Sequence, residues 1–310
     1  MIRIRRLHHV ALRTRDAAVA SERWARLHAL TPAALAGGTA LLRCTDEDYG
    51  LELIEGDEPG HDHTAYELEG GLTLEAAERG LRDLGVPTTR VDGPCGRAGA
   101  LALRDPEGNG VHLLEHIEPA DRRPYEAKEL GTAPAHHPRR VQHVNFLVAD
   151  IRAWVDFHTD VLGFGVSDWI GDGACWLHVD ADHHVLAGMV KPRPHFHHLA
   201  LELHDFAAMR VALDHLGQHG RWVTWGPGRH TMARNLFSYV RMCEEECFVE
   251  LFCDMEILRP GHQPRQWPDD VRSSNAWGTL PPRTYFRFDA EAVRIEREQL
   301  VNLGLEFVSA

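Results

Sequence analysis

The sequence predicts an α+β fold of four βαβββ modules that pair into two open, barrel-like domains. Three observations predict it. Segment 141–148 alternates apolar and polar residues, as a half-buried strand does, and an amphipathic helical segment follows it from Asp150. The same order of features occurs near the N-terminus, where 143 − 9 and 150 − 16 both give an offset of 134 between matching His and Asp residues. Within each half, a strand followed by a helix then occurs once more. The chain is therefore predicted to be a duplication of a two-module unit.

The pattern divides each half into two modules. In the first half we expect helices over 16–29 and 73–84, with strands at 7–14, 40–43, 50–55, 64–68, 99–103 and 110–116. In the second half we expect helices over 150–162 and 205–219, with strands at 141–148, 176–179, 184–190, 198–203, 235–242 and 247–253. The predicted domains are a non-catalytic N-terminal module pair (1–118), a linker (119–138), a catalytic, metal-binding module pair (139–256), and a tail that packs on the catalytic domain (257–310).

Composition restricts the class of protein. A chain of 310 residues with 44% apolar residues can fill two cores of about 150 residues each. A net charge of −13 disfavours nucleic acid or an anionic membrane surface as a partner, so a small molecule is expected. No apolar run is long enough to span a bilayer, and the six cysteines show no regular pairing, as is typical of reduced thiols. We therefore expect a cytoplasmic protein without nucleic-acid or membrane partners.

Three residues of the second half are candidate metal ligands. His143 lies on the first strand of that half, His198 begins a later strand, and Glu250 lies within the last strand. Each lies in an otherwise apolar strand, where an unpaired carboxylate would be costly to bury. Two imidazoles and one carboxylate are the ligand set of non-haem Fe(II) oxygenases, and they leave positions open for other ligands. The alternative is that these are ordinary core or surface residues, since the chain has 22 histidines.

Further residues suited to dioxygen chemistry occur in the same half. His184 follows Asp182 and His183 into an apolar strand, His230 follows Gly228 and Arg229, and Tyr239 lies in a predicted strand. With these residues, the chain resembles the type I extradiol ring-cleaving dioxygenases of the vicinal oxygen chelate superfamily, over residues 1–256 and most specifically over 141–250.

The resemblance implies a role for each residue. His143, His198 and Glu250 would bind the metal, His184 would be the acid–base catalyst, and His230 and Tyr239 would contact substrate and intermediates. It implies a glyoxalase-like fold, Fe(II) as cofactor with Mn(II) possible, and a homo-oligomer active in aromatic hydrocarbon catabolism. The reaction would be extradiol cleavage of a catechol-type diol by O2, giving a hydroxymuconic semialdehyde-type product.

Two positions depart from the family pattern. An Asp-Pro-x-Gly turn usually precedes the ligand glutamate, whereas here 242–246 read Met-Cys-Glu-Glu-Glu. Enzymes of the homoprotocatechuate type, which resemble segment 226–230, have an arginine just before that segment to hold a carboxylate, whereas here Trp225 stands there. We expect a less acidic, more apolar catechol as substrate.

The first half repeats part of the metal pattern. His9, His63 and Glu115 are separated by 54 and 52 residues, against 55 and 52 for the second-half trio, so the spacing permits a second metal. The resembling enzymes generally keep one active half, which favours a trio without metal. Two other functions use the same scaffold: a glyoxalase-like metal-dependent isomerase or transferase, and a drug-binding or drug-sequestering protein.

Overall fold

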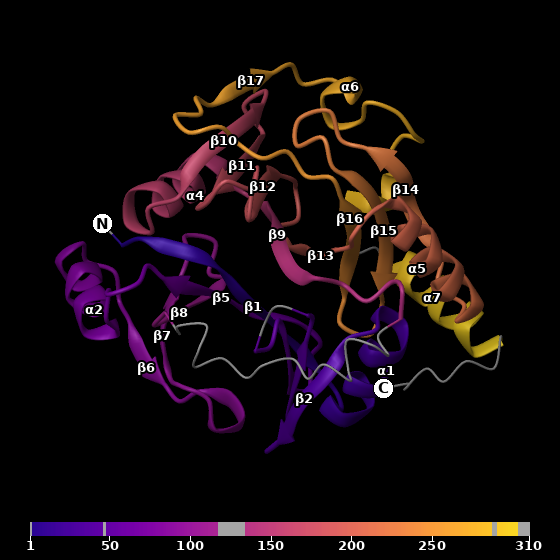
Figure 1. Ribbon diagram of the computed structural model, residues 1–310, viewed down its shortest axis with the longest axis horizontal. Helices are drawn as coiled ribbons and strands as arrows, with labels where there is room; N and C mark the ends of the chain where they lie inside the picture. The colour runs from indigo at the N-terminus through magenta and orange to yellow at the C-terminus, as the bar shows by residue number, and fades with distance from the viewer. Residues whose placement is uncertain (1, 46–47, 117–133, 287–289, 303–310) are drawn as a thin grey trace.

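Two large mixed β-sheets form the molecule, one from each half of the chain. The computed structural model describes residues 2–45, 48–116, 134–286 and 290–302. Figure 1 shows the first half in indigo and purple and the second in magenta to orange, with β1 and β9 near the centre. The strand orders are β2-β3-β4-β1-β5-β8-β7-β6 and β14-β15-β16-β13-β9-β12-β11-β10-β17. The predicted α+β class is confirmed, and each sheet joins the two modules of one half.

The first half has two helices and eight strands. The helices are α1 (Ala17–His28) and α2 (Leu74–Asp83). The strands are β1 (Ile4–Thr14), β2 (Thr31–Ala36), β3 (Thr39–Arg43), β4 (Leu51–Glu55), β5 (Gly60–Leu68), β6 (Thr89–Val91), β7 (Ala100–Arg104) and β8 (Gly110–Leu114). A short 3-10 turn, η1 (Pro94–Gly96), precedes β7.

The second half repeats this plan and adds the tail. Its helices are α4 (Ile151–Asp156), which continues as the π-helical turn η3 (Phe157–Val161), and α5 (Phe206–Gln218). Its strands are β9 (Arg140–Val148), β10 (Gly165–Ile170), β11 (Ala174–His178), β12 (Leu186–Val190), β13 (His195–Glu202), β14 (Val223–Arg229), β15 (Leu236–Met242) and β16 (Cys247–Cys253).

Each module begins its helix with the same device. Asp16, Thr73, Asp150 and Asp205 each accept a hydrogen bond from a backbone N–H of the first helical turn. Such caps satisfy donors that have no partner within the helix. The four predicted helices are therefore present, with ends within a few residues of the predicted ones.

The strand predictions failed mainly at the edges of the sheets. The strands β2, β6, β10 and β14 were not predicted, and each lies at or near a sheet edge. Their burial is uneven, so neither a strict alternation nor a continuous apolar run marks them. Most of the predicted linker lies outside the described residues.

A buried tryptophan fixes α4 on the second sheet. Trp154 is fully buried, and a Cβ at Gly188 of β12 would lie only 2.6 Å from its ring. A glycine is therefore needed at 188 for the helix to approach the strand. The indole Nε1 of Trp154 donates to Asp105 Oδ2 of the first half at 3.0 Å, so this contact also joins the two halves.

The unusual glutamate turn between β15 and β16 joins the halves a second time. Glu245 is fully buried and accepts hydrogen bonds from Thr14 Oγ1 and Trp24 Nε1, both at 3.2 Å, and from Arg23. The neighbouring Glu244 forms an ion pair with Arg221. The departure from the family's turn therefore has a structural role in this chain.

The tail lies along the second half. Its strand β17 (Arg265–Trp267) extends the second sheet by pairing in parallel with β10. It continues through α6 (Val271–Ser274), the 3-10 turn η4 (Arg283–Phe286) and α7 (Ala290–Asn302). Tyr285 of η4 packs with Trp225, Phe237, Tyr239 and Phe248. No helix in the described ranges has both the length and the apolar composition to cross a membrane.

Candidate metal centre and the cavity above it

Strand register brings the three predicted ligands of the second half to one face. Ala200 of β13 pairs with His143 of β9 on one side and with Glu250 of β16 on the other. His198 precedes Ala200 by two residues on β13. Directly paired residues share a face, and so do residues two apart along a strand. The small side chain of Ala200 leaves space between the three ligand groups.

The ligand atoms are spaced as an ion requires. Glu250 Oε2 lies 3.0 Å from His143 Nε2 and 3.3 Å from His198 Nε2, and all three side chains are buried. Two ligands that each lie about 2.1 Å from one ion, at angles between a right angle and the tetrahedral value, are about 3.0–3.4 Å apart. The two separations between carboxylate and imidazole therefore match those of ligands around a divalent transition-metal ion.

Hydrogen bonds orient each ligand toward the ion position. His143 Nδ1 contacts Gln142 Oε1 at 2.7 Å, so Nδ1 carries the proton and Nε2 presents its lone pair. His198 Nδ1 contacts His197 Nδ1 at 2.7 Å, and His197 Nε2 in turn donates to the Tyr285 carbonyl at 2.7 Å. A neutral His197 must then accept at Nδ1, so His198 also presents Nε2.

The charge of the trio suits a cation. Burial by itself would raise the pKa of Glu250, but His143 and His198 outweigh this effect and hold the pKa well below its usual value. Burial lowers the pKa of His198 to about 4. A buried carboxylate beside two imidazoles is a ligand set whose negative charge a bound cation compensates.

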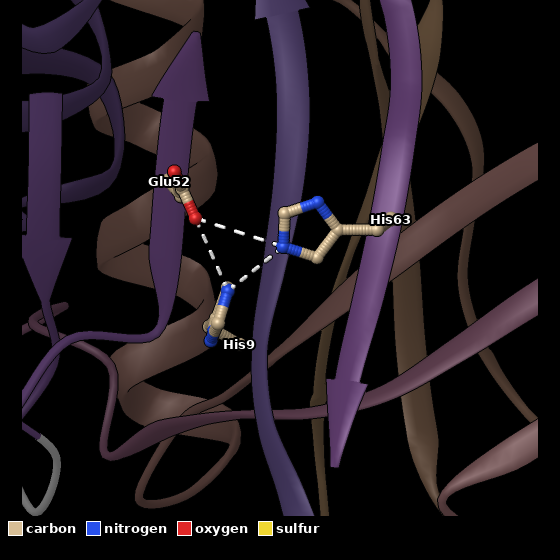
Figure 2. Close-up of side chains that lie close together, drawn as sticks. All are labelled: His9, Glu52 and His63. Carbon is tan, nitrogen blue, oxygen red and sulfur yellow. Dashed lines mark hydrogen bonds and ion pairs between the residues drawn. The ribbon is translucent and has the colours of Figure 1, made fainter. Parts of the chain in front are cut away.

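The structure corrects the trio predicted in the first half. His9 and His63 do come together, with their Nε2 atoms 3.2 Å apart. Glu115 lies elsewhere, because its Oε1 accepts a hydrogen bond from the backbone N–H of Leu74 at 2.7 Å, at the start of α2. Glu52 of β4 takes the third place instead (Figure 2). The prediction selected Glu115 in place of Glu52 because spacing along the sequence does not indicate which strands are neighbours in the sheet.

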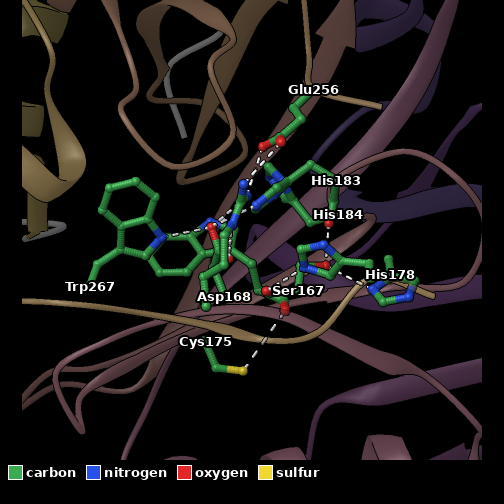
Figure 3. Close-up of polar contacts among 11 residues, drawn as sticks. Ser167, Asp168, Cys175, His178, His183, His184, Glu256 and Trp267 are labelled. Carbon is green, nitrogen blue, oxygen red and sulfur yellow. Dashed lines mark hydrogen bonds and ion pairs between the residues drawn. The ribbon is translucent and has the colours of Figure 1, made fainter. Parts of the chain in front are cut away.

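A polar network of residues from β10, β17 and the segment before β12 holds His184 (Figure 3). His184 Nδ1 contacts His183 Nδ1 at 3.1 Å, and His183 Nε2 contacts Asp168 Oδ2 at 3.0 Å. Since the carboxylate can only accept, His183 carries a proton on Nε2, and a neutral His183 accepts at Nδ1. His184 must then donate from Nδ1, which leaves its Nε2 as the basic nitrogen. The His184 ring centroid lies 4.3 Å from that of His143.

Asp168 is the centre of this network. It is fully buried and accepts from Arg265 Nε at 2.7 Å, Arg265 Nη2 at 3.0 Å and Trp267 Nε1 at 2.9 Å. Burial opposes its ionisation, but the hydrogen bonds from His183 and Arg265 outweigh burial and lower the pKa of Asp168. Because Arg265 and Trp267 belong to β17, the tail is part of the support for the predicted acid–base residue.

The two predicted substrate-contacting residues are held in a similar way. His230 Nδ1 donates to the Ser274 carbonyl of α6 at 2.6 Å, so a neutral His230 accepts at Nε2. Tyr239 Oη lies 3.1 Å from that Nε2 and is positioned to donate to it. Tyr239 pairs directly with Glu250 across β15 and β16, which puts it on the same face as the ligands. Burial raises the pKa of Tyr239, so its hydroxyl keeps its proton at neutral pH.

All six predicted residues of the second half line one cavity of about 410 Å³. Its remaining lining is largely apolar and aromatic and includes Ile170, Trp176, Met189, Trp225, Met232, Val271, Tyr285 and Phe286. Cavities of this size and character hold small organic ligands. The tail therefore forms part of the cavity wall.

Several residues of the site were not predicted. Gln142 orients His143 and also donates from Nε2 to the His184 carbonyl at 2.9 Å. Asn235 Nδ2 donates to Glu250 Oε1 at 2.9 Å, and Asp168 supports His183. Gln142 could have been noticed because it adjoins a predicted ligand. Asp168 had no such signal, since its partners come from segments far apart in the sequence.

Comparison with known proteins agrees with this geometry. Residues 140–241 match the model of the glyoxalase/bleomycin resistance protein/dioxygenase superfamily. Metapyrocatechase 2 of Cupriavidus necator is 28% identical over 156 residues, which cover 48% of each chain, so this chain matches about half the length of that relative. Metapyrocatechase of Geobacillus stearothermophilus is 25% identical over 279 residues, which cover 82% of this chain and 83% of the relative.

Solved structures share the fold. Homoprotocatechuate 2,3-dioxygenase from Arthrobacter globiformis superposes with a TM-score of 0.80 at 22% identity, covering 92% of this chain and 91% of that one. The Mn(II)-bound glyoxalase from Novosphingobium aromaticivorans gives 0.79 at 24% identity, covering 92% and 94%. At these identities the structures show the fold alone. With the names of the relatives, they confirm the predicted glyoxalase-like fold and the resemblance to extradiol dioxygenase enzymes.

Proposed function

We propose that this chain, whose residues 140–241 match the model of the glyoxalase/bleomycin resistance protein/dioxygenase superfamily, cleaves the ring of a catechol-type diol with O2 beside the two hydroxyls. Both oxygen atoms would enter the product, a hydroxymuconic semialdehyde or its ketone analogue. The observation that carries the proposal is the trio His143, His198 and Glu250 at the base of a cavity that His184, His230 and Tyr239 also line.

The metal we propose is Fe(II), with Mn(II) as the alternative. Bound by two imidazoles and one carboxylate on one face, it would offer adjacent open positions for the diol and for dioxygen and would favour loss of a diol proton. Two imidazoles and one carboxylate are the ligand set that non-haem Fe(II) oxygenases use, which supports this choice.

The residues around the cavity have separate roles in this proposal. His184 Nε2 takes a proton from the substrate and returns it when the ring opens, because the His183 contact keeps the proton of neutral His184 on Nδ1. Tyr239 and His230 face the reacting oxygens as hydrogen-bonding groups, in a cavity whose wall the tail helps to form. Asp168 and Gln142 act as positioning residues, through His183 and His143 respectively.

The cavity favours a catechol with an apolar substituent. Trp225 is buried, stacks on Tyr239 with an angle of 9° between the rings, and donates from Nε1 to the Thr279 carbonyl at 2.7 Å. Lys191 is the one cationic residue among the described residues that line the cavity, and its ammonium lies 4.2 Å over the ring of Phe286. A carboxylate-bearing substituent would therefore compete with an aromatic contact for this ammonium.

A catechol panel tests the reaction. The protein is loaded with Fe(II) without oxygen and mixed with catechol, methyl- and phenyl-catechols, or a catechol with an acetate side chain, and air is then admitted. We expect a yellow product, one O2 consumed per ring, and higher kcat/KM for the apolar substituents. If the second-half site holds one iron and no diol gives a product, the proposal is refuted.

Variants separate metal binding from proton transfer. Glu250→Ala should lose the second-half metal, whereas His184→Phe should keep the metal and turn over about 10²–10⁴-fold more slowly. His204→Ala is the control, because His204 is an exposed histidine outside the cavity. Full metal occupancy in Glu250→Ala would contradict the ligand assignment.

A glyoxalase-like isomerase is the second candidate, favoured by the fold shared with the Mn(II)-bound glyoxalase. Turnover of a glutathione hemithioacetal, with no oxygen uptake from any diol, would support it. Binding of a drug without turnover or metal would instead support the sequestering function. We also propose the cytoplasmic location and the homo-oligomer that the sequence predicts. Size-exclusion chromatography with light scattering tests the oligomeric state.

A further inference from the structure

The first half contains its own buried group of metal-ligating side chains, well apart in the fold from the cavity described above. His9 of β1, Glu52 of β4 and His63 of β5 converge in Figure 2. We propose that these three residues, joined by His112 of β8, form a second site for a divalent transition-metal ion. The proposal is independent of catechol cleavage and would stand if that reaction were absent.

The distances are those of ligands around one ion. His9 Nε2 lies 3.2 Å from His63 Nε2 and 3.2 Å from Glu52 Oε2, and His63 Nε2 lies 3.7 Å from Glu52 Oε2. Two of these separations equal the spacing expected for ligands that are each about 2.1 Å from a common ion, and the third is slightly wider. All three side chains are buried.

Both imidazoles are oriented through their other nitrogen. His63 Nδ1 contacts Asp62 Oδ1 at 2.8 Å, so it carries a proton there and presents its Nε2 lone pair. His9 Nδ1 contacts His8 Nδ1 at 2.8 Å, which leaves Nε2 of His9 toward Glu52 and His63. A carboxylate behind a ligand histidine is a common support in metal sites.

The Glu52 carboxylate is buried against two imidazole rings and makes no hydrogen bond through Oε2 among the described residues. Glu52 is 5% exposed. The groups nearest to this oxygen are the imidazole rings of His9 and His63. An isolated buried anion is costly, and a cation between Glu52, His9 and His63 would remove the cost.

The two sheets place these residues at matching positions, with one exchange. His9 pairs with Ala65 on β5 as His143 pairs with Ala200 on β13, and the register puts His63 where the second half has His198. The residue that pairs with Ala65 from β8 is His112, which therefore occupies the position of Glu250.

Glu52 restores the carboxylate from the opposite neighbour of β1. It pairs with Ala11 on β1, and the equivalent second-half position on β12 is Ala187, which pairs with Asn145. The His112 ring stacks on His63 with centroids 3.6 Å apart, which places a third imidazole next to the trio. The first half thus has three imidazoles and one carboxylate at these positions, whereas the second half has two imidazoles and one carboxylate.

A cavity reaches two of the four proposed ligands, His63 and His112. A cavity of about 810 Å³ is lined by His63, His112 and Asp62, with Arg13 and Arg193 at its wall. An ion reaching this cavity meets His63 and His112 directly. Imidazole-rich sites with one carboxylate favour Zn(II), Fe(II), Co(II) or Ni(II) over Mg(II) and Ca(II), which prefer oxygen ligands.

Cobalt binding to the full chain tests the proposal. The second-half site is first disabled with His143→Ala and Glu250→Ala, the protein is stripped with a chelator, and Co(II) is added by equilibrium dialysis. We expect about one Co(II) per chain, with visible absorption bands of a histidine-ligated ion. Adding Glu52→Gln should weaken binding by at least about tenfold, because the ligand charge is lost.

Glu115→Gln in the same background is the matched control and should leave binding unchanged. The undisabled chain gives an independent reading, with two Co(II) expected per chain and one in Glu52→Gln, which serves if the disabled variant does not fold. One Co(II) in the undisabled chain that Glu52→Gln does not alter would overturn the proposal. So would loss of the first-half ion in Glu115→Gln with retention in Glu52→Gln.

Discussion

Asp168→Asn provides a sharp test of the network behind His184. In the wild-type protein Oδ2 accepts from His183, Trp267 and Arg265 Nη2, and Oδ1 accepts from Arg265 Nε. An asparagine has one acceptor oxygen and one NH2 group. With the oxygen at the Oδ2 position, three of the four contacts survive and the NH2 faces Arg265 Nε–H. The reverse orientation keeps only one contact and is therefore disfavoured.

The cost follows from the contact that is lost. A hydrogen bond between charged groups contributes about 1.5–3 kcal/mol, and two opposed donors at a buried position add a desolvation penalty. We expect the free energy of unfolding to fall by about 2–4 kcal/mol, measured by urea denaturation. Because the His183 contact survives, the proton arrangement of His184 is kept, and kcat should fall by less than about tenfold.

The pH dependence gives a second reading of the same variant. The pKa of Asp168 is lowered in the folded protein, so its ionised form contributes stability above the unfolded-state pKa of about 3.9. This contribution is lost as pH falls through the folded pKa. The stability difference between wild type and Asp168→Asn should therefore stay constant from about pH 5 to 8 and narrow below about pH 4.

Asp172→Asn is the matched control for this substitution. Asp172 forms an ion pair with Arg152 at 2.7 Å, but its side chain is 94% exposed, so its loss should cost less than about 1 kcal/mol. A change in Asp168→Asn no larger than that of the control would refute the assignment of Asp168 as the centre of a buried network.

Three further variants test other parts of the structure. His183→Phe removes the acceptor for His184 Nδ1, so kcat in the diol assay should fall at least about 100-fold with unchanged metal content, whereas equal kcat would exclude a positioning role. Trp225→Arg should shift kcat/KM toward the catechol with an acetate side chain, and an unchanged substrate ranking would show that position 225 does not select the substituent. Glu245→Ala leaves Thr14, Trp24 and Arg23 without their shared acceptor and should lower the free energy of unfolding by about 3–5 kcal/mol, with Glu246→Gln in the same turn as control. A loss below about 1 kcal/mol would contradict the joining of the two halves through Glu245.

Local pattern was enough to predict the helices and the inner strands. Alternation marks strands buried on one face, and Asp16, Thr73, Asp150 and Asp205 mark helix starts, because both signals act within a few residues. The strands β2, β6, β10 and β14, at or near the sheet edges, were missed, since their partially exposed side chains obey no simple period. The tail strand β17 could not be predicted, because its pairing with β10 joins segments far apart in the sequence.

The sequence by itself determined the duplication and the module order, which depend on spacing within a repeated unit. It also identified the six residues that line the second-half cavity, from residue type and from the resemblance to a known family. Only the tertiary structure decided which residues meet. Glu115 has the right spacing but caps α2, while Glu52 joins His9 and His63 because β4 lies beside β1. Asp168, Arg265 and Trp267 support His183 for the same reason. Register between strands depends on the packing of the whole sheet, so distance along the chain does not determine it.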